Sequence, residues 1–249
     1  MPVFELLVVF VSLAFGGILK GATGAGAPIL AVPALAAFHD VRFAIVIMTV
    51  PNLVTNLMQV WRHRRHHLLP SFLVPFLLAA SAGVMLGTWG LAELDSRTLS
   101  LIVALAVLLY LALRLLKTNW QLDFVHARRL AAPLGFLSGV VQSSAGISAP
   151  VSISFLNAMR LERQVFMNTV SLLFVTFVLV QLPALAIAGI LTPGGLLLSS
   201  LALLPMLMGM PLGAFIARHV SRQAFDRLIM LLLAGLALRM LWEALVPGT

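Results

Sequence analysis

Long apolar runs separated by short clusters of charge are the dominant pattern along this chain. Charged residues are absent from 43–61, 68–92, 130–159 and 164–217. A helix needs about 20 residues to cross the roughly 30 Å hydrocarbon core of a bilayer, so each run is long enough and the last is long enough twice. The pattern predicts an all-α polytopic membrane protein.

Little of the chain is left for a soluble domain. The longest interval between apolar segments, about 117–129, has the length of a loop. The composition agrees, because 61% of the residues are hydrophobic, 10% are charged and the mean hydropathy is +1.08, outside the range of soluble domains. We therefore expect residues 1–249 to form a single transmembrane domain.

The second half of the chain repeats features of the first half after 122 to 126 positions. The coincidences pair Gly17 with Gly139, Gly24 with Gly146, Pro28 with Pro150, Gln59 with Gln181, GVMLG (83–87) with GMPLG (209–213), and LALRLL (111–116) with LALRML (236–241). Their common order predicts a duplicated unit of four apolar segments, with repeat 1 at about 1–120 and repeat 2 at about 127–249.

The placement of the basic residues predicts how the repeats cross the membrane. If all eight segments crossed fully, Lys and Arg would divide almost evenly between the two faces. If the first segment of each half is instead a broken re-entrant hairpin followed by three transmembrane helices, the two repeats have inverted topology. One face then receives twelve basic residues and the other receives Arg42, Arg97 and Arg239. This asymmetry is typical of a cytoplasmic and an outer face, so we expect both termini on the outer side. The twelve are Arg62, Arg64, Arg65, Arg114, Lys117, Arg128, Arg129, Arg160, Arg163, Arg218, Arg222 and Arg227.

Each predicted hairpin turns in a stretch rich in small residues, at 20–27 in LKGATGAGAPILAVP (19–33) and at 142–149 in the second half. Residues 3–19 would descend about 25 Å and residues 27–38 would climb about 18 Å, which places the first turn near mid-bilayer. Non-helical backbone is tolerated at that depth only where it is buried in protein or lines a wet cavity.

A helix that restarts after such a break directs free N–H groups and partial positive charge toward the cavity, which suits an anion. Pro28 and Pro150 both fit the first turn of a restarting helix. The candidate binding residues at the breaks are Lys20, Gly21, Thr23, Gly24 and Gly26, and Gln142, Ser143, Ser144, Gly146 and Ser148. For Lys20 the alternative is a lysine that snorkels or pairs within the bundle.

The next segment, TVPNLVTNLMQVW, places Asn52, Asn56 and Gln59 on one helical face. This stripe either faces the cavity, as we expect, or hydrogen-bonds between helices. In the second half Asn168, Ser171 and Gln181 are more scattered. Gly83, Gly87, Gly209 and Gly213 are expected to serve close helix packing.

Several classes of function are disfavoured by what the chain lacks. All eight acidic residues fall in loops or near segment ends, so no buried carboxylate is available for a cation or as a proton relay. Any proton coupling would then travel with a protonatable substrate. The chain has no cysteine, and its histidines are peripheral, which argues against a membrane-embedded enzyme.

The net charge of +8 lies in short loops, where it sets topology, so no nucleic-acid partner is expected. The loop RHRRHH (62–67) has a metal site as its alternative reading. Three arginines among the histidines would repel a cation, which favours a topology signal at anionic lipid. We expect no cofactor and no resident metal.

The segment GGILKGATGAGAPILAVPAL resembles the glycine-rich signature of the TauE/SafE sulfite exporter family, also called the 4-toluene sulfonate uptake permeases. LGFLSGVVQSSAGISAPVSISFL is similar to that family's second repeat. The family's motif falls here on Gly17, Gly21, Gly24, Gly26 and Pro28, and on Gly139, Gly146 and Pro150. This chain departs from it in the second copy, where Ser143, Ala145 and Ser148 replace the equivalents of Gly21, Thr23 and Gly26, so a strictly symmetric site is in doubt.

The resemblance implies export of sulfite or a small organosulfonate across a bacterial inner membrane. Our leading hypothesis is a secondary transporter, not an enzyme, that holds its anion between the two hairpin tips and alternates access. A passive anion channel, and a transporter of another small anion such as a carboxylate, are the alternatives. The expected partners are this anion and the lipid bilayer, and a homo-oligomer is possible.

Overall fold

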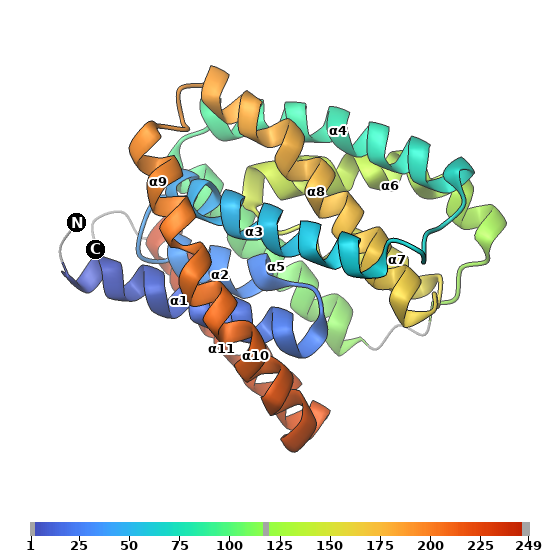
Figure 1. Ribbon diagram of the computed structural model, residues 1–249. Coiled ribbons are helices and arrows are strands. Elements are labelled where there is room, and N and C mark those ends of the chain that lie inside the picture. The colour runs from blue at the N-terminus through green and yellow to red at the C-terminus, as the bar shows by residue number, and fades with distance from the viewer. Residues whose placement is uncertain (1–2, 117–119, 246–249) are drawn as a thin grey trace.

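The structure is a computed structural model that describes residues 3–116 and 120–245. Within these ranges the chain forms eleven α-helices and no strand, which confirms the all-α prediction. α9 and α10 are separated only by Ala202, so together they form one broken helix (Figure 1). The helices are α1 (Val3–Thr23), α2 (Ala27–Ala36), α3 (Val41–His63), α4 (Pro70–Glu93), α5 (Ser96–Leu115), α6 (Phe124–Ala145), α7 (Ser152–Ala158), α8 (Arg163–Ile187), α9 (Pro193–Leu201), α10 (Leu203–His219) and α11 (Arg222–Leu245).

Seven helical segments in the described ranges are long and apolar enough to cross a membrane, which confirms a polytopic membrane protein. They are α1, α3, α4, α5, α8, the α9–α10 pair and α11. α6 is long enough but is not among them, since it has Arg128 and Arg129 near its start and Gln142 near its end. Length and composition do not distinguish a re-entrant α1 from a spanning one, so the re-entrant hairpins stay a prediction.

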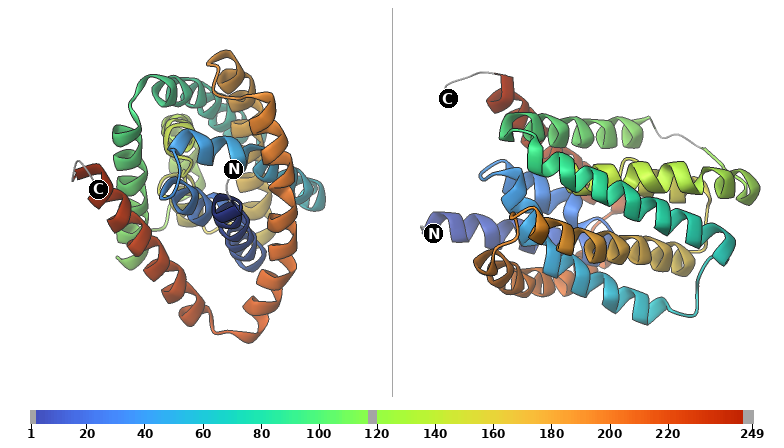
Figure 2. Two further views of the ribbon diagram at one scale, coloured as in Figure 1. Left: turned by 90° about the vertical axis from the view of Figure 1, so that its left-hand side faces the viewer. Right: turned by 90° about the horizontal axis from the view of Figure 1, so that it is seen from above.

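The two halves of the chain pack on each other reciprocally. α1 packs along α10. In the duplicated unit α6 corresponds to α1 and α4 corresponds to α10, and α6 packs along α4 in the same way. α3 packs on its counterpart α8, and α5 on its counterpart α11. In the left-hand view of Figure 2, α4, α5, α10 and α11 lie around the first hairpin, α1 and α2. This exchange is what the duplicated unit predicts, and it supports the inverted arrangement, which itself stays a prediction.

Small residues allow the α1–α10 and α4–α6 pairs to approach closely. A Cβ atom on Gly17 would overlap the carbonyl oxygen of Met206, and one on Gly209 would overlap that of Ala14. In the other pair, Gly83 and Gly139 meet backbone carbonyls in the same way. The packing role expected for the helix glycines is confirmed, because backbones in contact leave no room for a side chain.

Both predicted breaks are present. α1 continues through Lys20 to Thr23 and α2 begins at Ala27, while α6 ends at Ala145 and α7 begins at Ser152. Gly24, Gly26 and Gly146 have φ angles of 80°, 93° and 72°, which side chains rarely adopt. The glycines therefore permit the chain to leave α1 and α6 at these points.

The second hairpin differs from the first in its return arm. Pro28 lies in the first turn of α2, as predicted. The same prediction for Pro150 is wrong: α7 starts two residues later, after a turn in which the N–H groups of Val151 and Ser152 both donate to the carbonyl of Ser148. α7 has 7 residues whereas α2 has 10, so the two return arms are unequal.

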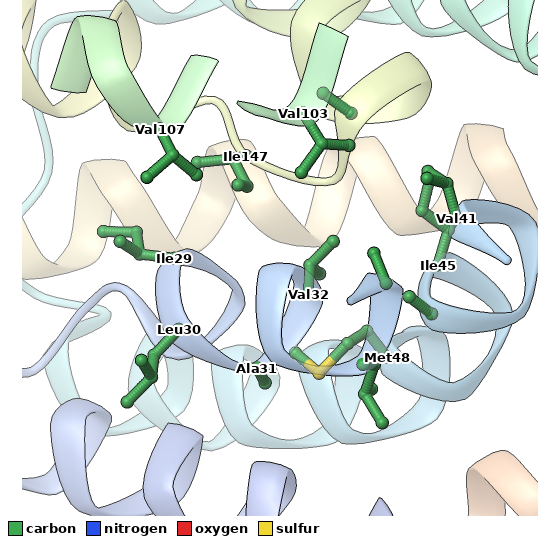
Figure 3. Close-up of a cluster of buried hydrophobic side chains, with 14 of the residues drawn as sticks. Ile29, Leu30, Ala31, Val32, Val41, Ile45, Met48, Val103, Val107 and Ile147 are labelled. Atoms are coloured by element: carbon green, nitrogen blue, oxygen red, sulfur yellow. The ribbon is translucent and has the colours of Figure 1, made fainter. Parts of the chain in front are cut away.

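α2 lies at the centre of the fold. Nearly all of its residues are buried, as expected for a helix that is apolar on every side. Val103 and Val107 of α5 cluster with Ile29 and Val32 of α2, and Ile147 from the second break joins them (Figure 3). The second hairpin tip is therefore held against the middle of α2.

Candidate functional site

Lys20 is a buried lysine that has no anionic partner among the described residues. It lies in the last turn of α1, is 2% exposed, and is the one charged side chain buried within the described ranges. Its Nζ donates a hydrogen bond to Oδ1 of Asn56 on α3 at 2.8 Å. The hydrogen-bond acceptor of the Lys20 amino group is thus the oxygen of a neutral amide.

Asn56 connects Lys20 to Asn52 one turn away. Asn56 Nδ2 donates to Asn52 Oδ1 at 2.6 Å and to the Asn52 carbonyl at 2.7 Å. An ammonium group only donates hydrogen bonds, so it fixes the direction of both amides. Asn52 Nδ2 is then left as a donor with no partner among the described residues, at the end of a row that starts at Lys20.

Asn52 lines a narrow pocket formed by α2, α3, the end of α6, the second break and α8. Its polar lining comes from Thr49, Asn52, Gln142 and Gln181. The free volume is about 10 Å³, which is at the lower limit for one water molecule. Binding of an oxyanion would therefore require these helices to separate. The remaining lining residues are Pro28, Val32, Ile45, Met48, Gly146 and Val178.

Two glutamines satisfy polar backbone groups at the second break. Gln142 Nε2 donates to the Gly146 carbonyl at 3.2 Å, and Gln142 Oε1 accepts from the Ser148 N–H at 3.1 Å. Gln181 Nε2 donates to the carbonyl of Ser143 at 3.3 Å. These bonds replace the helical bonds that the break removes, and they leave the break ordered beside the pocket.

Gln59 has the corresponding position at the first break. Its Nε2 donates to the Gly24 carbonyl at 2.6 Å, and its Oε1 accepts from Ser171 Oγ on α8 at 3.0 Å. The sequence match between Gln59 and Gln181 therefore corresponds to a shared role, since each binds a carbonyl at or near the end of a broken helix.

Part of the predicted set is brought together. Lys20, Asn56 and Asn52 form the hydrogen-bonded row, and Asn52, Gln142 and Gly146 line the pocket. Gly24 is bound by Gln59, and its Cβ position faces Met167 of α8. The second tip contacts Val32, in the middle of α2, through Gly146. The first tip therefore contacts α3 and α8 and the second tip contacts α2, and an anion site between the two tips stays a prediction.

The hydroxyls and small residues of the predicted set lie elsewhere. Thr23 is exposed, and its hydroxyl donates to the carbonyls of Leu19 and Ala25. Gly21 faces the backbone of α10, and Gly26 is the buried residue that precedes α2.

The predicted serines of the second break are buried but bond locally. The hydroxyls of Ser143 and Ser144 donate to carbonyls of their own helix, α6. Ser148 Oγ accepts a hydrogen bond from Ser152. None of these three residues lines the pocket described above.

Ser199 of α9 was not predicted. Pro51 interrupts α3 and, having no N–H, leaves the carbonyl of Ile47 without its helical donor. Ser199 Oγ donates to this carbonyl and accepts from the N–H of Val50, both at 3.0 Å. The proline signals a free carbonyl in the sequence, but which segment supplies the partner depends on packing.

Thr49 and Gln181 were also missed as pocket residues. Thr49 lies one turn before Asn52 on α3, and its hydroxyl contacts Ser199 Oγ at 3.2 Å. An extension of the Asn52–Asn56–Gln59 stripe by one turn would have included it. The sequence pairs Gln181 with Gln59 but does not place it at a pocket.

Comparison with known proteins gives one family. The family model described as sulfite exporter TauE/SafE matches residues 9–240, which include both breaks and every residue that lines the pocket. No curated protein and no solved structure gives a significant match. The chain belongs to the sulfite exporter TauE/SafE family, a family of membrane transporters for sulfite-like anions.

Proposed function

We propose that this protein is a secondary transporter that exports a small sulfur-containing anion such as sulfite or an organosulfonate. The observation that carries the proposal is the row from buried Lys20 through Asn56 to Asn52, which ends at a pocket. No carboxylate is buried within the described ranges, so the site has a positive charge and neutral donors but nothing to attract a cation.

The pocket suits an oxyanion because such an anion accepts hydrogen bonds through several oxygens. Asn52 Nδ2 is a donor beside it that has no partner among the described residues, and the side-chain amides of Gln142 and Gln181 each have a second N–H beyond the one donated at the second break. We expect the anion to bind Asn52 directly, with the charge of Lys20 acting through the amide row. A carboxylate has fewer acceptor oxygens and is the weaker candidate.

Alternating access follows from where the pocket lies. α2 and α3 belong to the first proposed repeat (about 1–120), while α6, the second break and α8 belong to the second (about 127–249). If the inverted repeats rock against each other within this single transporter domain, the pocket opens to one side of the membrane and then to the other. The pocket has a free volume of only about 10 Å³, too narrow for an open pore, which favours this mechanism over a passive channel.

The arrangement of arginines supports a topology with both termini on the periplasmic side of an inner membrane. Each of the three arginines expected on the outer face has a partner in the structure. Arg42 forms an ion pair with Asp40, Arg97 donates a hydrogen bond to the Ala244 carbonyl, and Arg239 forms an ion pair with Glu243. The α3–α4 connection and the start of α6, which carry cytoplasmic-set arginines, lie at the end opposite the start of α1 and the end of α11 (Figures 1 and 2).

Purified protein tests the proposal in two steps. Thermal unfolding is first measured with sulfite, thiosulfate, sulfoacetate, taurine, methanesulfonate and simple carboxylates. A true ligand at about a hundred times its Kd stabilises by about 2.7 kcal/mol. Saturable flux of the same anion into proteoliposomes then identifies a transporter, whereas single-channel conductance would identify a channel.

Lys20→Met is the decisive variant, and Arg128→Met is its matched control because it removes one exposed cation from α6. We expect Lys20→Met to lose both the thermal shift and the flux, while Arg128→Met retains them. Equal transport by both variants would remove Lys20 from the site. Stabilisation by none of the sulfur anions would overturn the proposed function.

A further inference from the structure

Lys20 has more hydrogen-bonding capacity than its surroundings use. A protonated lysine offers three N–H donors, and the described residues supply one acceptor, Asn56 Oδ1. The buried polar residues of the described ranges include no Asp or Glu. In the empty site a charged Lys20 would thus be buried with a single neutral partner.

The helices that surround Lys20 add no negative charge. α2 has no titratable residue, and α10 has Arg218 and His219 in its last turn. α3 has Arg42 at its start and Arg62 and His63 at its end. None of these side chains bonds to Lys20 in the part of the chain that the structure describes, and none could compensate an ammonium group.

The cost of this arrangement depends on the proton. A buried, uncompensated ammonium costs several kcal/mol, whereas a neutral amine avoids most of that cost. An anion in the adjoining pocket changes the balance, because it attracts the ammonium form and is attracted by it. The coupling is reciprocal. The free energy by which a bound anion strengthens proton binding equals the free energy by which the bound proton strengthens anion binding.

We infer that Lys20 takes up a proton together with the anion and releases both on the other side, so that transport is proton-coupled. The inference rests on the proposed function. On the loading side, a proton from water bonds to the Nζ lone pair and the anion enters beside Asn52. On the unloading side, the anion leaves and the Nζ–H proton returns to water, so one proton and one anion move in the same direction.

This inference revises an expectation from the sequence. With no buried acid, proton coupling had to depend on a protonatable substrate. A buried base fulfils the same role for anions that stay fully ionised, such as an organosulfonate. The coupling would then belong to the protein and extend to substrates that carry no proton of their own.

Calorimetry of anion binding tests the inference. Binding of sulfite, thiosulfate and methanesulfonate to the full-length protein is measured at mildly alkaline pH in two buffers with different ionisation enthalpies. The last two anions do not titrate near neutral pH, so any proton taken up belongs to the protein. We expect uptake approaching about one proton per anion bound.

Two variants separate proton coupling from binding. Lys20→Arg has a guanidinium that keeps its proton, so anion binding should persist while proton uptake falls to zero. Asn56→Asp, which has nearly the same shape as the native side chain, gives Lys20 a permanent carboxylate partner. It should weaken anion binding by about tenfold or more and also abolish proton uptake.

The outcomes distinguish the inference from the function on which it rests. Anion binding without proton uptake in the wild-type protein would overturn the coupling and leave the transporter standing. Unchanged proton uptake in Asn56→Asp or Lys20→Arg would assign the proton to another group and equally overturn the inference. Binding of none of the three anions would overturn both.

Discussion

Ser171 on α8 donates a hydrogen bond to Gln59 on α3, with 3.0 Å between Ser171 Oγ and Gln59 Oε1. The same Gln59 holds the carbonyl of Gly24 at 2.6 Å. One amide therefore joins the first helix break to the helix of the other half that packs on α3. Any movement between α3 and α8 must lengthen this bond or carry the break with it.

Removing this link should lower both stability and transport. Gln59→Leu leaves the Gly24 carbonyl without its donor and should cost about 1–3 kcal/mol in unfolding free energy. Ser171→Ala should cost less. Because both changes remove the same Ser171–Gln59 bond, the double variant should be little worse than Gln59→Leu alone. Chemical denaturation in detergent measures this, with Ser200→Ala, an exposed serine of α9, as the control. Additive losses would mean that the two residues act independently.

A negative charge introduced at the pocket should weaken anion binding. Asn52→Asp preserves the shape of the side chain but places a carboxylate where the pocket offers its free donor, so affinity for sulfite should fall by at least about tenfold. The thermal shift with sulfite measures the change. Asn157→Asp makes the same substitution at an exposed position near the end of α7 and should bind normally. If the two variants bind equally well, Asn52 does not contact the anion.

Alanine at the packed glycines should destabilise the fold in proportion to the overlap. Gly17→Ala and Gly139→Ala each drive a methyl group into a carbonyl of the facing helix, so we expect a loss of about 1–3 kcal/mol or more. Gly235→Ala on α11 meets nothing within 4 Å and should be neutral or stabilising by up to about 1 kcal/mol. Unfolding midpoints compare the three variants, and equal effects would refute close packing as the reason for the first two glycines.

Gly146→Ala should be destabilising for two separable reasons. Its φ of 72° is unfavourable for a side chain, and the new Cβ would lie 2.7 Å from Cγ1 of Val32. Backbone strain in this region costs about 1–2 kcal/mol. Adding Val32→Ala relieves the overlap but not the strain, so it should recover part of the loss beyond its own cost. A double-mutant cycle measures the recovery, and no coupling between the two positions would contradict the contact.

Cysteine labelling tests the topology, and the chain has no native cysteine to interfere. Arg64→Cys lies between α3 and α4 and should be protected from an impermeant maleimide in intact cells. Leu94→Cys lies between α4 and α5 and should be labelled from outside. The reverse pattern would invert the proposed orientation.

Several features of the fold follow from local sequence alone. The lengths of the uncharged runs determine where the long helices lie and how long they are, because the hydrocarbon core must be crossed by an apolar segment of about fixed length. Gly24, Gly26 and Gly146 set the breaks, since these backbone angles exclude most side chains. The isolation of Lys20 within an apolar segment indicated a buried cation, and the absence of acidic residues from the spans indicated an anion site.

The composition of the site was decided by contacts between segments far apart in the chain. Gly21 and Ser143 are predicted binding residues, and in the structure helix packing turns them toward α10 and α4 and away from the pocket lining. Ser199 reaches Ile47 from 152 positions away, and Gln181 joins the pocket because α8 packs on α3. A hydrophobic run fixes that a helix forms and how long it is. Which of its faces meets a partner depends on the shapes of all the helices packed together, so only the tertiary structure settled it.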